Sequence, residues 1–142
     1  MKKGLVLTVL ICALSLVKAS MAEDDARQLV EFPEMMQQHM LANMRDHLAA
    51  INEILDQMAK GRLEEAADIA ETRLGLSSLE AHGASHMAGL MPEGMRNAGT
   101  EMHSAASQFA LRAQEGDALI AYGALPSVTA ACVACHAAYR VH

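Results

Sequence analysis

The residues with the clearest chemistry lie near the C-terminus, in the segment Cys132-Val133-Ala134-Cys135-His136. Two cysteines three positions apart, with a histidine directly after them, form the C-x-x-C-H pattern of covalent haem attachment. Each cysteine sulfur can form a thioether with one vinyl group of the porphyrin, and the histidine can donate a ring nitrogen to the iron. We therefore expect one haem c per chain, held by Cys132 and Cys135, with His136 as the proximal iron ligand.

The same two cysteines are also compatible with a redox-active dithiol or a zinc site. A thioredoxin-like dithiol is expected in a βαβ setting near the start of a domain. A structural zinc site needs further cysteine or histidine ligands at paired spacing. Neither pattern accompanies Cys132 and Cys135, so the sequence favours haem attachment.

Residues 1–22 have the features of an export signal. A positively charged start is followed by the apolar run Leu5–Val17, which is too short to span a bilayer comfortably. Small residues then lead to Ala22, where we expect cleavage, with Ala19 as the less favoured site. The third cysteine of the chain, Cys12, would leave with this segment. Export agrees with the haem motif, because covalent haem attachment takes place outside the cytoplasm.

Residues 23–142, the 120 residues that would remain, amount to one domain. The leader holds three of the eleven basic residues and none of the seventeen acidic ones, so its removal takes the formal charge from −6 to −9. This charge disfavours nucleic acid as a partner and favours a redox partner protein with a basic surface. It is also typical of a well-solvated helical protein. We expect a periplasmic protein with no membrane anchor once the leader is removed.

The composition and periodicity of the domain predict an all-α protein. Helix-forming Ala, Met, Leu, Glu and Gln are abundant, β-branched and aromatic residues are scarce, and no stretch alternates like a strand. Apolar residues at steps of three and four, bounded by proline and glycine, predict four long helices. Their expected ranges are 33–60, 62–74, 92–115 and 117–141. Four amphipathic helices of this length predict a helix bundle.

Two interruptions of this pattern carry expectations of their own. Residues 75–92 contain three glycines and a proline, so we expect a solvated crossover there with a short helix around residues 78–87. Pro126 lies inside the last helix and has no N–H to donate, so we expect it to kink or split that helix. The haem motif would lie after this break.

The C-terminal segment resembles the C-x-x-C-H-x-x-[Tyr/Phe]-Arg ending of the cytochrome c′ family, with Tyr139 and Arg140 at its last two positions. The resemblance covers the domain in architecture, but in sequence only these last residues are specific. It implies an antiparallel four-helix bundle with haem attached on the C-terminal helix. It also implies that Arg140 lies near the haem, and that the chain pairs as a homodimer through its first two helices.

The other axial position of the iron decides between two functions within that family. In an antiparallel bundle the distal face would be covered by the start of the first helix, whose candidate ligands are Met36, His39, Met40, Met44 and His47. The segment Met40-Leu41-Ala42-Asn43 resembles the Met-Lys-Ala-Asn segment of the family's low-spin branch, which implies Met40 as distal ligand and electron transfer as function. A stripe of methionines is also ordinary core packing, and an apolar distal face would give a five-coordinate protein that binds nitric oxide or carbon monoxide. We expect His47 at the solvent or the edge of the core.

A second group of side chains is compatible with a different class of function. His82 and His86 are four positions apart, with His103 and several methionines nearby in sequence. Histidines at this spacing on a helix can bind a metal ion, and methionine with histidine in an exported protein favours copper. The competing interpretation is a solvated crossover without metal. No nucleophile–base pair or phosphate-binding loop is evident, so we expect no catalytic residues and no enzyme activity.

Overall fold

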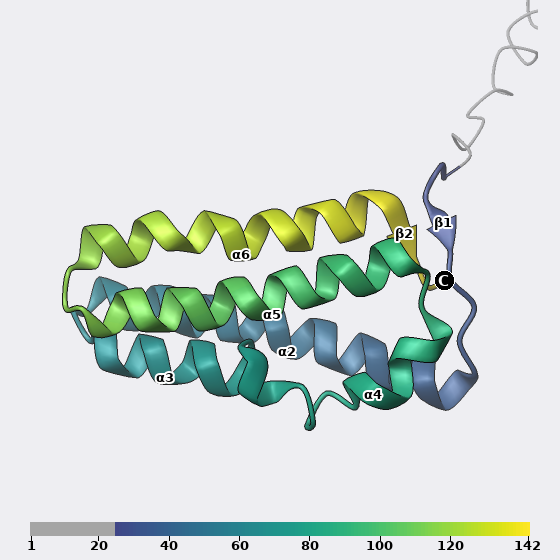
Figure 1. Cartoon of the computed structure of the whole chain (residues 1–142), viewed down its shortest axis with the longest axis horizontal. Coiled ribbons are helices and arrows are strands. Elements are labelled where there is room, and N and C mark those ends of the chain that lie inside the picture. Colours follow the sequence, from purple (N-terminus) through teal and green to yellow (C-terminus); the bar gives the residue numbers. More distant parts are fainter. Residues whose placement is uncertain (1–24) are drawn as a thin grey trace, which may run out of the picture.

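The computed structural model describes residues 25–142, and the expected export signal lies outside them. Four long helices make up most of this part of the chain: α2 (Glu34–Ala59), α3 (Leu63–Arg73), α5 (Glu93–Gln114) and α6 (Ala118–Ala138). They lie side by side along the longest axis of the molecule (Figure 1). The all-α class is confirmed, and each helix begins and ends within a few residues of its expected position.

The helices begin and end at residues whose backbone chemistry suits those positions. Pro33 and Pro92 immediately precede α2 and α5, where proline's fixed φ favours the start of a helix. The side chain of Asp117 caps α6 by accepting two backbone N–H bonds from its first turn. Gly61 and Gly116 follow α2 and α5 with φ values of 72° and 82°, a left-handed conformation that glycine adopts without strain.

Pro126 does not split the last helix, contrary to one of the outcomes expected from the sequence. It lies inside α6, which continues as one helix from Ala118 to Ala138. The missing hydrogen bond would have gone to the carbonyl of Tyr122. Both Pro126 and Tyr122 are exposed, so water can satisfy that carbonyl and the helix tolerates the proline.

The crossover between α3 and α5 is more tightly packed than expected. It contains η2 (Leu76–Ser78), α4 (Ala84–Met87) and η3 (Ala88–Leu90). The helix expected over residues 78–87 is therefore reduced to one turn, because Gly83 precedes it in a left-handed conformation. Ser78 and Met87 are almost fully buried, whereas neighbours such as Glu80 and His86 are exposed, so the crossover is only partly solvated.

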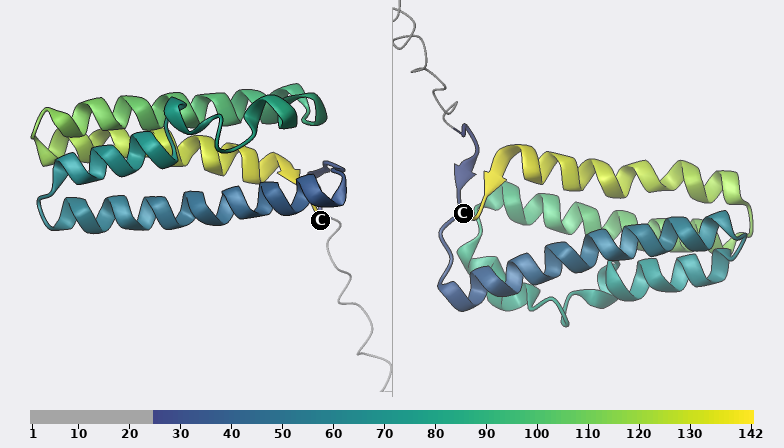
Figure 2. Two further views of the ribbon diagram at one scale, coloured as in Figure 1. Left: turned by 90° about the horizontal axis from the view of Figure 1, so that it is seen from below. Right: turned by 180° about the vertical axis from the view of Figure 1, so that it is seen from behind.

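Two short strands join the beginning and the end of the described chain. β1 (Gln28–Leu29) pairs in parallel with β2 (Tyr139–Arg140), and the Val30 N–H extends the ladder by donating to the Arg140 carbonyl at 2.8 Å. Strands of two residues leave no alternation to detect in a sequence. The pairing places the start of α2 and the end of α6 at the same end of the molecule (Figure 2).

The helices pack in the order α2 on α3, α3 on α5, and α5 on α6. Their shared core is rich in alanine, which allows close approach, and is filled by the larger side chains Ile54, Leu74 and Phe109. In the described part of the chain α2 and α6 make few backbone contacts with each other. A second cluster of Val30, Met40, Met87, Met95 and partly buried neighbours fills the end where the strands lie.

The last helix, α6, is unusually apolar. Its mean hydropathy is 1.8, and by length and composition alone it could cross a membrane. Only 22% of the most apolar stretch of this helix is buried inside the molecule. Part of its apolar surface is turned toward the space beside α2, where the cavities described below are found.

Candidate functional site

Cys132 and Cys135 lie near the end of α6, one turn apart, so their side chains share a face of the helix. Both are free, half-buried thiols. Burial raises the pKa of both thiols, and the Cys132 Sγ lies 3.4 Å from the carbonyl of Val128. A reactive dithiol needs a lowered pKa to form thiolate. The environment therefore does not suit a redox-active pair, whereas two free thiols on one face can each be joined to the same group.

Two cavities adjoin the C-x-x-C-H segment, and the larger of these two, which both cysteines line, has a volume of about 360 Å³. Its wall comes from α2, α5 and α6, with one residue from the end of α3. Almost all of the wall is apolar; His47, Thr129 and His136 are its polar members. A cavity of this kind suits a large apolar ligand held by a few polar contacts.

A smaller cavity of about 200 Å³ adjoins the first. The two share three lining residues, Met44, Cys135 and His136, so they meet at the C-x-x-C-H segment. The wall of the smaller cavity is more polar, because Arg27 and Arg140 contribute to it. Together the cavities form a slot that is apolar along one part and cationic at its end near the strands.

The structure distinguishes among the five candidate distal ligands. Met40 is 8% exposed and lines the smaller cavity together with His136, and Met44 lines both cavities. Met36 packs against the methionine cluster but lines neither of these two cavities. His39 faces the crossover instead, with its Nε2 2.9 Å from the carbonyl oxygen of His82. Three of the five candidates therefore line a cavity together with His136: Met40, Met44 and His47.

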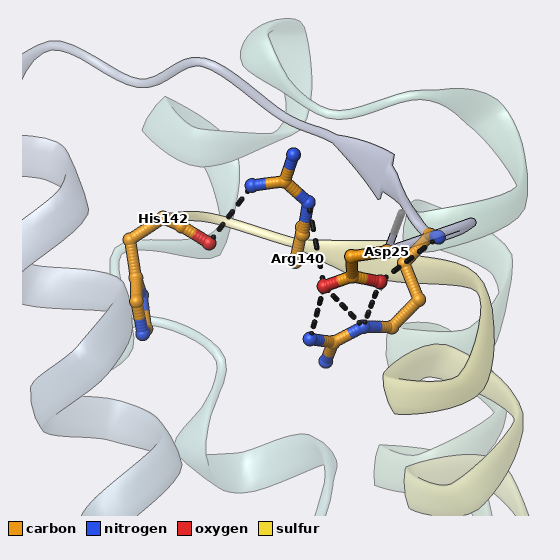
Figure 3. A network of polar contacts seen from close by, with 4 residues as sticks. Asp25, Arg140 and His142 are labelled. Carbon is orange, nitrogen blue, oxygen red and sulfur yellow. Dashed lines mark hydrogen bonds and ion pairs between the residues drawn. The ribbon is translucent and has the colours of Figure 1, made fainter. Parts of the chain in front are cut away.

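Arg140 lines the smaller cavity and takes part in a network of polar contacts (Figure 3). Its Nη1 donates to the His142 carbonyl at 3.0 Å, and its Nε lies 3.5 Å from the Asp25 carboxylate. Arg27 holds the same carboxylate, with 2.6 Å between its Nη2 and Oδ2 of Asp25. Hydrogen bonds from Arg27 lower the pKa of Asp25 to about 2. In the described part of the chain, two guanidinium groups thus share the Asp25 carboxylate at this edge.

The histidines of the crossover lie in an arrangement that differs from the expected one. His82 and His103 are close together, but their third neighbour is His47 of α2, with ring centroids 4.7 Å and 5.9 Å from those of His82 and His103. His86 is exposed and takes no part. The grouping of His82 with His86 is therefore wrong, because α4 is a single turn and does not carry both residues on one helix face.

Of the two positions expected for His47, the one at the solvent is wrong, because the residue lies at the wall of the larger cavity. His47 is 9% exposed, because the crossover packs over its position on α2. Burial lowers its pKa to about 4, with smaller contributions from His82 and His103. Burial likewise lowers the pKa of His82. No spacing in the sequence links His47 to the other two rings, since three separate segments contribute them.

Comparisons with known protein families, with curated proteins and with solved structures gave no match. The functional assignment therefore depends on the chemistry and geometry of the residues described above.

Proposed function

We propose that this chain is an exported, monohaem c-type cytochrome that transfers single electrons and has no catalytic residues. In this proposal Cys132 and Cys135 bind haem c through thioethers, and His136 is the proximal ligand. The proposal includes an antiparallel four-helix bundle of the cytochrome c′ kind. The observation that carries it is that the two thiols and the histidine of the C-x-x-C-H segment all line one slot.

The residues around the slot suit a haem. When bound, haem c supplies an iron that cycles between the ferrous and ferric states. The apolar wall between α2, α5 and α6 would exclude water from the macrocycle, which favours a small reorganisation on electron transfer. The sparse contact between α2 and α6 also fits a group that fills the space between them and covers the apolar face of α6.

Met40 is the proposed distal ligand. It is buried and lines a cavity with His136, and its thioether is a soft, neutral ligand that stabilises ferrous iron and raises the potential. Met44, one turn further along α2, is the nearest competitor because it lines both cavities. The greater burial of Met40 favours it over the half-buried Met44.

Arg140 and Arg27 are proposed to hold the haem propionates. Both line the cationic end of the slot, and a guanidinium binds a carboxylate through paired, charge-assisted hydrogen bonds. Asp25 already occupies part of their donor capacity, so it would limit the positive charge that the propionates meet. Outside this site, the acidic domain is expected to meet a redox partner protein through a basic surface on that partner.

The test is the visible absorption spectrum of the purified protein, oxidised and reduced, with and without carbon monoxide. We expect a low-spin ferric spectrum with a far-red thioether-to-iron band that carbon monoxide alters little. Met40→Ala should abolish that band and open the iron to carbon monoxide, whereas the matched control Met44→Ala should retain it. The reverse result would assign the ligand to Met44.

A broad high-spin spectrum of the unaltered protein, shifting on addition of the gas, would contradict electron transfer through a six-coordinate iron. It would support the five-coordinate, gas-binding alternative. A protein without a haem spectrum would contradict the whole proposal.

A further inference from the structure

Three histidine rings from three separate segments lie against one another beside the larger cavity. His47 belongs to α2, His82 to the turn between η2 and α4, and His103 to α5. The ring centroids of these residues are 4.7, 5.4 and 5.9 Å apart. His47 and His103 are 9% and 8% exposed, and His82 is half-buried. We propose that these rings, here called the histidine triad, bind one late first-row divalent transition-metal ion.

The spacing of the triad suits such an ion. A metal about 2.0–2.1 Å from one nitrogen of each of three imidazoles, in tetrahedral geometry, separates the ring centres by about 5 Å. The observed separations lie close to that value. In the described part of the chain no group of His, Cys, Asp or Glu side chains already converges as a metal site. Binding therefore requires the triad to adjust by rotation about side-chain bonds, and His47, whose Nε2 has no hydrogen-bond partner in the described part of the chain, is the ring that no such bond at this atom holds in place.

Hydrogen bonds from neighbouring residues leave two of the three rings with a free Nε2 lone pair. His103 Nδ1 lies 2.6 Å from the carbonyl oxygen of Leu74, which can only accept, so this nitrogen carries the proton. Ser78 donates its one hydroxyl proton to the Gly75 carbonyl at 2.7 Å. Its oxygen, 3.3 Å from His82 Nδ1, must therefore accept from that ring. Metal-binding histidines commonly have their second nitrogen fixed in this way.

The third ring, that of His47, has a nitrogen atom without a hydrogen-bond partner in the described part of the chain. His47 Nε2 is buried and has no hydrogen-bond partner, and an unpaired buried polar atom is costly unless something binds it. The ordinary alternative, three neutral imidazoles in a core, leaves that cost unexplained. Neutral imidazole is also the form that binds metal, and a site of three nitrogens suits zinc or copper.

The site is distinct from the proposed haem ligands but close to them. His47 lines the larger cavity together with Cys135 and His136. Three protein ligands leave a fourth tetrahedral position, which a water molecule or another small ligand would occupy. The inference does not rest on the haem proposal, because none of its three residues belongs to the C-x-x-C-H segment.

The first experiment is a titration of the purified holoprotein, treated with a chelator, with zinc(II) in the presence of a competing chromophoric chelator. We expect one zinc per chain. Copper(II) bound instead should show an electron paramagnetic resonance spectrum with splitting from imidazole nitrogens. Absence of stoichiometric binding of either ion would overturn the proposal.

Variants then locate the site. His82→Gln and His103→Gln should each weaken zinc binding at least about tenfold, whereas His86→Gln, an exposed histidine of the same crossover, should leave it unchanged. If His103→Gln fails to fold, His82→Gln alone decides, because its ring is half-buried. Zinc binding that is unaffected by His82→Gln, or that is lost in His86→Gln, would overturn the proposal. The visible spectrum of each variant reports separately on haem, so failure of the metal site is distinguishable from failure of the proposed function.

Discussion

His136 and His47 lie on the same cavity but in opposite surroundings. His136 is exposed on the last turns of α6, next to a slot with apolar walls. His47 is buried on α2, with two other imidazoles in contact and a Nε2 that has no partner. The first environment has room for a large flat group but few polar atoms. The second has three imidazole rings in contact, which suits an ion or a proton. In the two proposals above, an imidazole side chain would serve two chemistries, according to the space and the neighbours around it.

The largest expected effect comes from replacing the two cysteines next to His136 that would attach the haem. Cys132→Ser combined with Cys135→Ser should abolish covalent haem, because neither hydroxyl can form the thioether. Haem retained on the denatured polypeptide in a gel measures this directly. Cys12→Ser is the matched control, and it should leave the exported protein fully loaded. Haem that stays covalently bound without Cys132 and Cys135 would show that these two residues do not attach it.

Burial of His47 should make the unfolding free energy of the metal-free protein decrease in acid. The pKa of His47 is about 4 in the folded protein against about 6.5 in an unfolded chain. Between these values the unfolded chain binds the extra proton, so stability falls as pH decreases. The full effect is about 3 kcal/mol of unfolding free energy. Denaturant unfolding between pH 7 and pH 4 measures it.

His47→Gln is the variant that isolates this contribution from other titrating groups. Its unfolding free energy should depend on pH less steeply than that of the unaltered protein over the same range. Equal slopes for the two proteins would mean that His47 is not held neutral by burial.

A smaller effect is expected where α5 meets the C-terminal strand. A Cβ on Gly94 would overlap the hydroxyl of Tyr139, which lines the smaller cavity. Gly94→Ala should therefore lower the free energy of unfolding by about 1 kcal/mol, as overpacking commonly does. Gly123→Ala in α6 meets no neighbour and should be neutral or stabilising. Thermal unfolding of both variants gives the comparison; a stabilised Gly94→Ala would show that the ring moves freely.

The smallest effect is expected from the ion pairs next to the histidine triad. Arg73 pairs with Asp46 at 2.5 Å and Glu53 at 2.7 Å, and all three side chains are partly solvated. Arg73→Ala should therefore cost no more than about 1 kcal/mol. Lys60→Ala removes a more exposed ion pair with Asp56. It should lower the free energy of unfolding by a few tenths of a kcal/mol at most. A loss of several kcal/mol for Arg73→Ala would mean that it also supports the triad.

The bounds of the helices were predictable because local chemistry sets them. Proline before α2 and α5, and glycine after α2 and α5, act within one turn of the chain. The C-x-x-C-H segment was likewise recognisable because its chemistry requires contiguous residues. The sequence therefore predicted every helix that lines the slot.

What could not be predicted depends on tertiary contacts. The triad joins His47 to residues of the crossover and α5, and no sequence period relates them. The burial of His47 follows from the crossover packing over α2, which depends on residues such as Met87 and Ser78 far along the chain. The β1–β2 pair is two residues long, and Pro126 is tolerated because its surroundings are exposed. The triad, the burial of His47 and the strand pair were decided by neighbours distant in sequence, and the tolerance of Pro126 by the exposure of its side of α6.

The most direct test of the central claim is the intact mass of the purified protein, measured together with the reactivity of its cysteines toward an alkylating reagent. The account predicts a mass larger than that of the polypeptide by one haem, and no alkylation of Cys132 or Cys135 after denaturation. A mass equal to that of the polypeptide alone, with both thiols alkylated, would contradict it.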